Sequence, residues 1–347
     1  MVVMGVLGFC DGEMIASAMQ QAKLKSPFPY FGGKSRIAAQ VWERFGDVRN
    51  YVEPFAGSLA VLLSRPHYPF VERRIETVND LDCFLANFWR AMQADDQAVA
   101  EHCDWPVNEA DLHARHYWLV NVGRGVVERL RTDPDFYDAK IAGWWVWGIC
   151  QWIGSGWCHH PEWQQLPHLG DAGRGVHRPT QQLPHLGNAN GQGITVYGDD
   201  LRDYLHAIAE RIRRVRVCCG DWRRVLGETP TTKQGTTAVF LDPPYTEKAT
   251  RKSGLYACDS ASIGHDVMQW AVENGGNPQL KIAVCGYDGE YDFPASWDRV
   301  AWKASGGYGS QGDDDNAAGR ANAKREVVWF SPACVNVRRV KQVSLFQ

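Results

Sequence analysis

Short apolar runs and amphipathic helical repeats alternate along most of the chain. Runs typical of buried strands occur at 50–52, 75–78, 215–219, 237–241, 280–285 and 326–330. Apolar residues at helical spacing occur before and between these runs, at 37–45, 59–63 and 201–212. Strands that alternate with helices form parallel sheets, whose ligand crevice lies at the carboxyl ends of the strands. The pattern therefore predicts an α/β fold with a doubly wound, mostly parallel sheet.

The alternation stops at residues 100–198. Six of the fifteen Trp lie between 144 and 163, and the heptapeptide QQLPHLG occurs at 164–170 and again at 181–187. Residues 305–324, rich in Gly, Ser, Asp and Asn, are expected to form a mobile loop. We expect these parts: an N-terminal extension at 1–26, a main α/β domain at 27–99 and 199–347, and an inserted, largely non-α/β domain at 100–198.

The composition, 44% hydrophobic and 22% charged residues, is that of a globular protein. No apolar stretch approaches the roughly 20 residues that a membrane-spanning helix needs, and the opening segment is a poor signal peptide. The ten Cys lack the spacing of a disulfide framework or of a standard zinc site. We therefore expect a soluble, cytoplasmic protein that contacts no membrane and holds no structural metal.

The charge distribution matters more than the net charge of -3, which does not by itself favour a polyanionic partner. Residues 201–224 carry seven Arg against three acidic residues, an excess of four positive charges. Residues 112–131 carry four Arg, among them Arg115 and Arg124, against one Glu. Runs of this kind are as often solvated helix faces as nucleic-acid contacts, and both interpretations stay open.

The sharpest motif is Asp-Pro-Pro-Tyr at 242–245, which directly follows an apolar strand run. It resembles the catalytic motif of amino-group methyltransferases that use S-adenosylmethionine. F-P-Y-F-G-G-K at 28–34 and E-P-F-A-G-S at 53–58 resemble the first two signatures of the Dam-like DNA adenine methyltransferases. V-N-D-L at 78–81 and C-C-G-D-W at 218–222 fall where that family has its ribose-binding acid and the strand before the catalytic one.

The order of these motifs is similar to the alpha arrangement of the Dam-like family, in which the insert recognises the target sequence. The resemblance covers about 27–95 and 210–335. It implies a seven-stranded methyltransferase sheet and a site-specific enzyme that methylates adenine in double-stranded DNA. A bacterial or phage-infected cell would be its setting. Methylation needs no metal, because the cofactor's leaving group departs as a neutral thioether.

The residue chemistry supports this interpretation of 242–245. Asp242 and the carbonyl group of Pro243 could accept both hydrogens of an adenine amino group and stabilise the positive charge that its nitrogen gains. Pro243 and Pro244 make the loop rigid, and Tyr245 offers a flat face for an extruded base. We therefore expect Asp242, Pro243, Pro244 and Tyr245 to be the catalytic residues.

The cofactor is expected to bind at the first two turns that follow strands. Gly57 permits close backbone approach, although Leu59 replaces the second Gly of the commoner family motif. Asp80 is placed to accept hydrogen bonds from ribose hydroxyls, or else to cap a helix. By resemblance, Lys34 would pair with the cofactor's carboxylate and Asp221 would lie near its adenine. The full expected set is Tyr30, Lys34, Glu53, Pro54, Phe55, Gly57, Asp80, Asp221 and Asp242.

Nucleic-acid contacts are expected from Arg115, Arg124, Arg251 and Lys252, the last two close to the catalytic motif. The Trp cluster of the insert could stack on bases or form a small helical core. Two other functions remain open at this point. One is methylation of a cytosine amino group or of an RNA base, and the other is a catalytically silent DNA-binding protein of the same fold.

Overall fold

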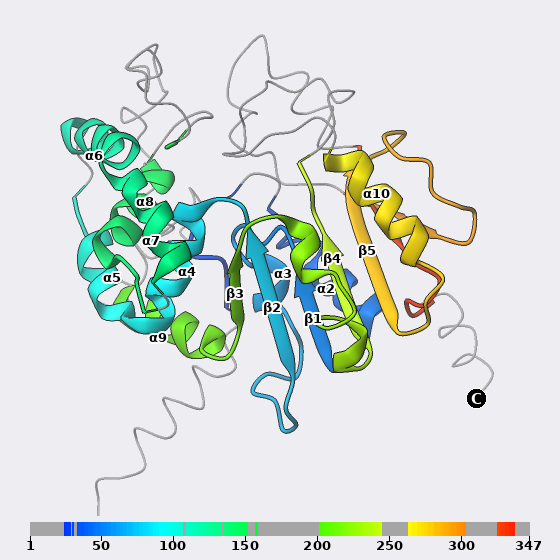
Figure 1. Ribbon diagram of the computed structural model, residues 1–347. Helices are drawn as coiled ribbons and strands as arrows, with labels where there is room; N and C mark the ends of the chain where they lie inside the picture. Colours follow the sequence, from blue (N-terminus) through cyan, green and yellow to red (C-terminus); the bar gives the residue numbers. More distant parts are fainter. Residues whose placement is uncertain are drawn as a thin grey trace, which may run out of the picture.

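The computed structural model describes residues 24–28, 30, 33–106, 109–133, 135–151, 157–158, 201–244, 263–302 and 325–336. Its centre is a seven-stranded sheet in the order β3-β2-β1-β4-β5-β7-β6 (Figure 1). The strands are β1 (Asn50–Glu53), β2 (Ile75–Asp80), β3 (Arg216–Cys219), β4 (Thr237–Leu241), β5 (Leu280–Tyr287), β6 (Asp298–Ala301) and β7 (Glu326–Phe330). Strands β1 to β5 pair in parallel, and β7 pairs antiparallel to both β5 and β6. The predicted doubly wound, mostly parallel sheet is confirmed.

Side chains alternate between the two faces along each strand, and the central strands contribute to a hydrophobic core on each face. Tyr51 and Phe240 point into a core shared with α2 (Ala38–Phe45), α3 (Ala60–Leu63) and α4 (Cys83–Ala94). Val52 and Leu241 point into a second core with α10 (Ile263–Asn274) and the 3-10 turn η6 (Trp222–Val225). Near-continuous apolar runs in β4 and β5 follow from this two-sided burial.

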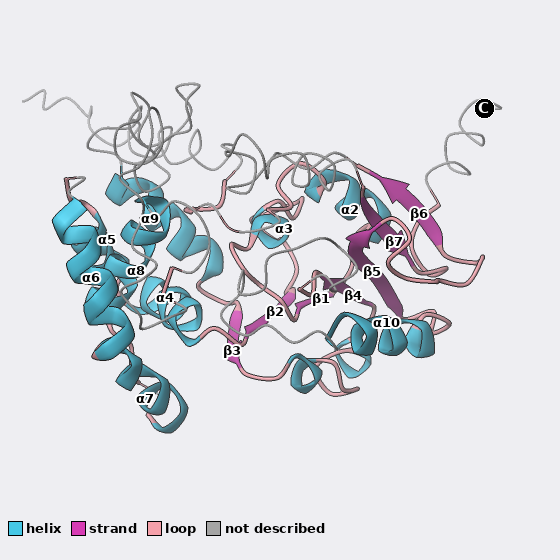
Figure 2. Ribbon diagram, turned by 90° about the horizontal axis from the view of Figure 1, so that it is seen from above, coloured by secondary structure: helices cyan, strands magenta, loops and turns pink. Residues whose placement is uncertain are grey.

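A group of helices fills the connection between β2 and β3. Figures 1 and 2 show it gathered beside β3, at the end of the sheet away from α10. It comprises α4, α5 (Asp96–Cys103), α6 (Glu109–Asn121), the turn η1 (Gly123–Gly125), α7 (Val126–Thr132), α8 (Ala139–Gln151) and α9 (Leu201–Ile212). A further 3-10 turn, η7 (Thr232–Gln234), precedes β4.

These helices share one core with the main sheet. The ring of Trp145 in α8 lies 5.2 Å from that of Phe28 and 6.1 Å from that of Phe88 in α4. The predicted boundary between residues 99 and 100 falls inside α5. The division into a main and an inserted domain stays a prediction, and the QQLPHLG repeat and residues 305–324 lie outside the described residues.

Candidate functional site

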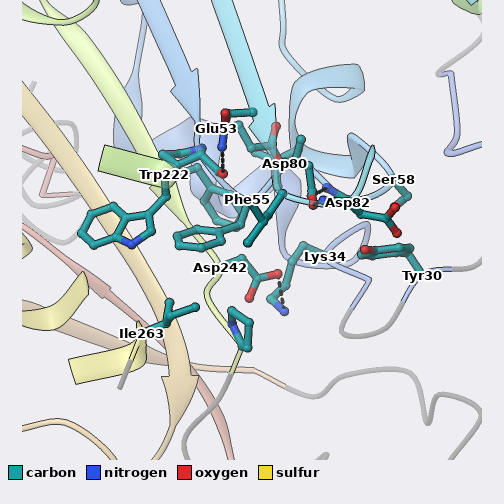
Figure 3. Close-up of a pocket in the computed structure, with 18 of the residues that line it drawn as sticks. Tyr30, Lys34, Glu53, Phe55, Ser58, Asp80, Asp82, Trp222, Asp242 and Ile263 are labelled. Carbon is teal, nitrogen blue, oxygen red and sulfur yellow. Dashed lines mark hydrogen bonds and ion pairs between the residues drawn. The ribbon is translucent and has the colours of Figure 1, made fainter. Parts of the chain in front are cut away.

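A cavity of about 300 Å³ opens where β1, β2, β3 and β4 end. Figure 3 shows side chains from the loop before α2 and from these strand ends pointing into it. This is the edge at which parallel α/β sheets bind ligands. The sequence-predicted residues that line it are Tyr30, Lys34, Glu53, Pro54, Phe55, Gly57, Asp80, Asp221, Asp242 and Pro244.

The turn after β1 is built by two residues with positive φ. Gly57 has φ +47°, and a Cβ atom there would lie 2.8 Å from the ring of Tyr30. Its amide donates to Asp80 Oδ2 (3.1 Å), and its carbonyl accepts from Trp89 Nε1 (3.1 Å). Leu59, with φ +57°, takes the left-handed conformation that a Gly would favour, and its side chain is fully buried. The turn therefore forms despite the departure from the family motif.

Asp80 holds the ends of β1 and β2 together. Besides the Gly57 amide, its carboxylate accepts from the backbone amide of Asp82 (3.0 Å). Burial raises the pKa of Asp80 to about 6, against the lowering effect of these backbone hydrogen bonds. The cap of α4 is Asp82, which accepts from the amides of Phe84 and Leu85. The alternative that Asp80 itself caps this helix is therefore excluded, and two carboxylates line this wall of the cavity.

Glu53 lies buried at the floor of the cavity, where it accepts a hydrogen bond from the hydroxyl of Tyr51 (2.9 Å). Burial raises the pKa of Glu53 well above its usual value, and the nearby charge of Asp242 raises it further. The hydrogen bond from Tyr51 opposes this rise only in part. Burial and the nearby charge of Asp242 thus both shift the protonation equilibrium of Glu53 toward its neutral form.

An ion pair between a buried lysine and a partly buried aspartate joins the first and last motifs. Lys34 Nζ lies 2.9 Å from Asp242 Oδ2, and the two side chains are 4% and 19% exposed (Figure 3). Lys34 comes from the loop before α2, and Asp242 follows the last residue of β4. Lys34 therefore contacts the predicted catalytic carboxylate directly, in addition to lining the cavity where a cofactor carboxylate is expected.

The opposite wall is aromatic. The rings of Phe55 and Trp222 lie 6.0 Å apart at an angle of 32°. Asp221 accepts from the amide of Arg223 (2.8 Å) and so caps the start of η6. The Arg223 guanidinium reaches Asp266 of α10 (2.6 Å) at the cavity mouth. Flat apolar rings beside carboxylates suit a ligand with a purine and polar hydroxyl groups.

Some predicted site residues lie elsewhere. Pro243 is buried after β4, while Tyr245, Arg251 and Lys252 fall outside the described residues. Arg124 is part of η1, and its side chain is outside the described atoms. Arg115 in α6 is only 7% exposed, and its guanidinium stacks on three Trp rings. These rings belong to Trp105, Trp144 and Trp147, at 5.2, 5.1 and 4.2 Å. The burial of Arg115 leaves it little surface for a phosphate contact.

Four of the seven Arg in the basic run at 201–224 form ion pairs with acidic residues. Arg211 is buried and pairs with both oxygens of Glu76 (2.8 Å each). Arg65 also pairs with this carboxylate (3.0 Å). Arg202, Arg213 and Arg223 have acidic partners on the surface. The two interpretations of the run at 201–224, a solvated helix face or a nucleic-acid contact, both require exposed arginines. Neither holds for Arg211, because its guanidinium is buried and pairs inside the protein.

Sequence reasoning missed several residues of the cavity wall, notably Asp82, Arg223 and Asp266. Asp82 could have been found, because a second acid two residues after Asp80 stands before an apolar helical repeat. Arg223 and Asp266 carried no signal, since their pairing depends on how α10 packs beside η6. In the described part of the chain, no group of three or more potential metal ligands occurs, and no helix has the length and apolarity to cross a bilayer.

Comparison with known families finds a match that covers the N-terminal residues of this site. Residues 30–118 match the family described as D12 class N6 adenine-specific DNA methyltransferase. The match includes Tyr30, Lys34, the β1 turn and Asp80, and it confirms the resemblance to the Dam-like enzymes. Comparison with curated proteins finds no match to this sequence.

Proposed function

From the match of residues 30–118 to the D12 class adenine-specific DNA methyltransferases, we propose a full reaction for this chain. It transfers a methyl group from S-adenosylmethionine to the exocyclic amino group of adenine in double-stranded DNA, after the adenine has been flipped out of the helix. The observation that supports this most strongly is the position of Asp242. Asp242 and Pro244, which follow β4, line the same cavity as the matched residues.

The residues present fit S-adenosylmethionine. Asp80 and Asp82 offer carboxylate oxygens for ribose hydroxyls, as acids do in dinucleotide sites. Phe55 and Trp222 offer apolar faces for a purine. Gly57 lies so close to the ring of Tyr30 that a Cβ atom there would be 2.8 Å from it, and both residues line the cavity. When bound, the cofactor would supply a methyl group on a positively charged sulfur.

Asp242 and Pro243 are proposed to act on the target amino group. The carboxylate of Asp242 and the carbonyl of Pro243 would accept its two hydrogens, which draws the nitrogen toward a tetrahedral shape and stabilises its developing positive charge. The ammonium group of Lys34 holds the Asp242 carboxylate in place through the 2.9 Å contact. Lys34 is thus a positioning residue for Asp242. Tyr245 would stack on the flipped base.

The test uses the full chain, S-adenosylmethionine with a labelled methyl group, and double-stranded DNA. Digestion and mass analysis of the nucleosides should find the label in N6-methyladenine. Asp242→Ala should lower transfer by at least about 100-fold, the usual effect of losing a transition-state hydrogen-bond partner. The exposed Asp203→Ala on α9 is the matched control and should retain activity.

Other outcomes would decide against the proposal. Label in a cytosine base or only in RNA would contradict adenine in DNA as the target. Cofactor binding without transfer to any DNA would favour a silent binding protein. Activity that survives Asp242→Ala would remove Asp242 from the catalytic role.

A further inference from the structure

Two thiols face each other behind the acidic wall of the cavity. The Sγ atoms of Cys83 and Cys219 lie 3.5 Å apart, although 136 positions separate the two residues in sequence. Both side chains are partly exposed, so a small reagent can reach them. Five other described cysteines, at 103, 150, 158, 285 and 334, are buried.

The two cysteines lie next to the two segments that form the proposed ribose site. Cys83 is the first residue of α4 and directly follows Asp82. Cys219 is the last residue of β3 and is the register partner of Asp80. The next residue, Gly220, donates its amide to the Asp80 carbonyl (3.0 Å), and its own carbonyl accepts from Asn79 (2.9 Å). A movement of either sulfur is therefore transmitted to residues that line the cavity.

We propose that Cys83 and Cys219 are an oxidation site that forms a reversible disulfide and lowers the affinity of the cavity for S-adenosylmethionine. The oxidant is a peroxide or a small-molecule disulfide. With hydrogen peroxide, one thiol is first oxidised to a sulfenic acid and one water is released. The second thiol then attacks this sulfur, its proton leaves with the hydroxide as a second water, and the S–S bond forms. A thiol reductant reverses the reaction by exchange.

The geometry explains why the bond would disturb binding. A disulfide holds its sulfurs about 2.05 Å apart, so they must approach by about 1.4 Å from their present separation. That displacement pulls the start of α4 and the end of β3 toward each other. Asp82 and Gly220, the immediate neighbours of the two cysteines, are both in the cavity wall.

The neighbouring Cys218 does not compete for the bond. Successive side chains on a strand point to opposite faces, and Cys218 packs against the second core, on the side of α10. The pKa of the Cys219 thiol is raised by its hydrogen bond with Cys83 and by burial, with the charges of Asp80 and Asp82 adding to the effect. Oxidation is consequently expected to accelerate as pH rises, because the thiolate is the reactive form.

The test treats the full chain with hydrogen peroxide and then, in half of the sample, with dithiothreitol. Peptide mapping should find Cys83 linked to Cys219. The dissociation constant for S-adenosylmethionine, measured by calorimetry, should rise about tenfold after oxidation and return after reduction, a typical size for coupling between two sites. Cys83→Ser should abolish both the cross-link and the change in affinity, whereas the control Cys218→Ser should leave both intact.

A second measurement uses the reciprocity of coupling. In glutathione buffers of graded potential, saturating S-adenosylhomocysteine should disfavour the disulfide. The factor should equal the one by which the disulfide weakens the binding of S-adenosylhomocysteine itself. Absence of the Cys83–Cys219 cross-link, or a disulfide that leaves the affinity unchanged, would overturn the proposal. Because the regulatory part rests on the proposed function, reduced wild-type protein is measured first. If that sample fails to bind S-adenosylmethionine, the proposed function has failed. Peptide mapping of the cross-link needs no cofactor, so it tests the oxidation site separately.

Discussion

Lys34 and Asp242 form a buried ion pair, with 2.9 Å between Nζ and Oδ2, that ties the loop before α2 to the end of β4. Removing one partner leaves the other charge buried without its counter-ion. The pair therefore connects the stability of the fold to the orientation of the proposed catalytic carboxylate, and variants of the two residues can separate these effects.

Lys34→Met should lower the free energy of unfolding by about 3 kcal/mol, because Asp242 is left as an uncompensated buried charge. Methyl transfer should fall about 100-fold in the same variant. Urea denaturation and initial rates measure the two effects. The double variant Lys34→Met with Asp242→Asn should recover most of the stability and none of the activity. The exposed Lys233→Met is the control. Equal stability of Lys34→Met and wild type would show that the pair contributes nothing.

We expect Asp80 to give the proposed cofactor binding a pH dependence. Its pKa is raised by burial from 3.8 to about 6, and its charged form is the better acceptor for ribose hydroxyls. The affinity for S-adenosylmethionine should fall about tenfold between about pH 7 and about pH 5, as the carboxylate takes up a proton. Calorimetry across this range checks it. Asp80→Asn should bind more weakly at neutral pH and lack this pH-dependent step.

The same shift affects stability with the opposite sense. The folded chain keeps a proton on Asp80 that the unfolded chain releases above its usual pKa of 3.8. This group therefore makes the protein less stable as pH rises toward about 6 and has no further effect above that value. Comparison of wild type with Asp80→Asn by urea denaturation at several pH values isolates this contribution. A difference that grows above pH 6 would contradict the assignment.

Gly57→Ala tests the tight approach between the β1 turn and Tyr30. The new Cβ would lie 2.8 Å from the Tyr30 ring, at a residue whose φ is +47°. We expect a loss of about 1–2 kcal/mol in stability from the backbone conformation alone, and a further loss of cofactor affinity from the displaced ring. Gly289→Ala is a matched control, because φ is +80° there and the space around it is open. It should show the backbone strain and unchanged binding.

Leu59 combines a strained backbone with a fully buried side chain. Leu59→Ala should cost about 2–4 kcal/mol, because it removes buried apolar volume and keeps the strain. Leu59→Gly loses the same volume but relieves the left-handed strain, so it should be about 1 kcal/mol more stable than Leu59→Ala. Thermal and urea unfolding of the two variants provide the comparison. If the alanine variant is the more stable of the two, strain at Leu59 is not significant.

Most strands that could be predicted are buried on both faces. β1, β2, β4, β5 and the antiparallel β7 follow from their apolar runs, and the partly exposed edge strand β3 was also predicted, because it carries the run Val217-Cys218-Cys219. The edge strand β6 was missed, because its four residues, Asp298–Ala301, are partly or fully exposed and show no apolar run. Burial determines the sequence of a central strand, whereas an edge strand needs only backbone pairing with its neighbour.

The candidate site was predictable where a residue ends a strand or directly follows one, as for Asp80 and Asp242. Contacts between distant segments were not, and the pairing of Lys34 with Asp242 is the main example. Arg115 illustrates the limit of charge patterns. Its positive charge indicated a phosphate contact, but the Trp rings of α8 and Trp105 cover it. A sequence shows which residues are charged, but the groups that surround each charge depend on how the chain packs.

The helices between β2 and β3 leave from one strand and return to the next, and these strands are parallel neighbours. Both ends of this long excursion are therefore fixed to neighbouring strands, at the carboxyl end of β2 and the amino end of β3, whatever lies between them. The entropic cost of closing a loop grows only slowly with its length. Evolution can lengthen or replace the excursion beyond α4 without moving the strand ends that form the cavity, and the family match indeed ends inside it, at residue 118 in α6.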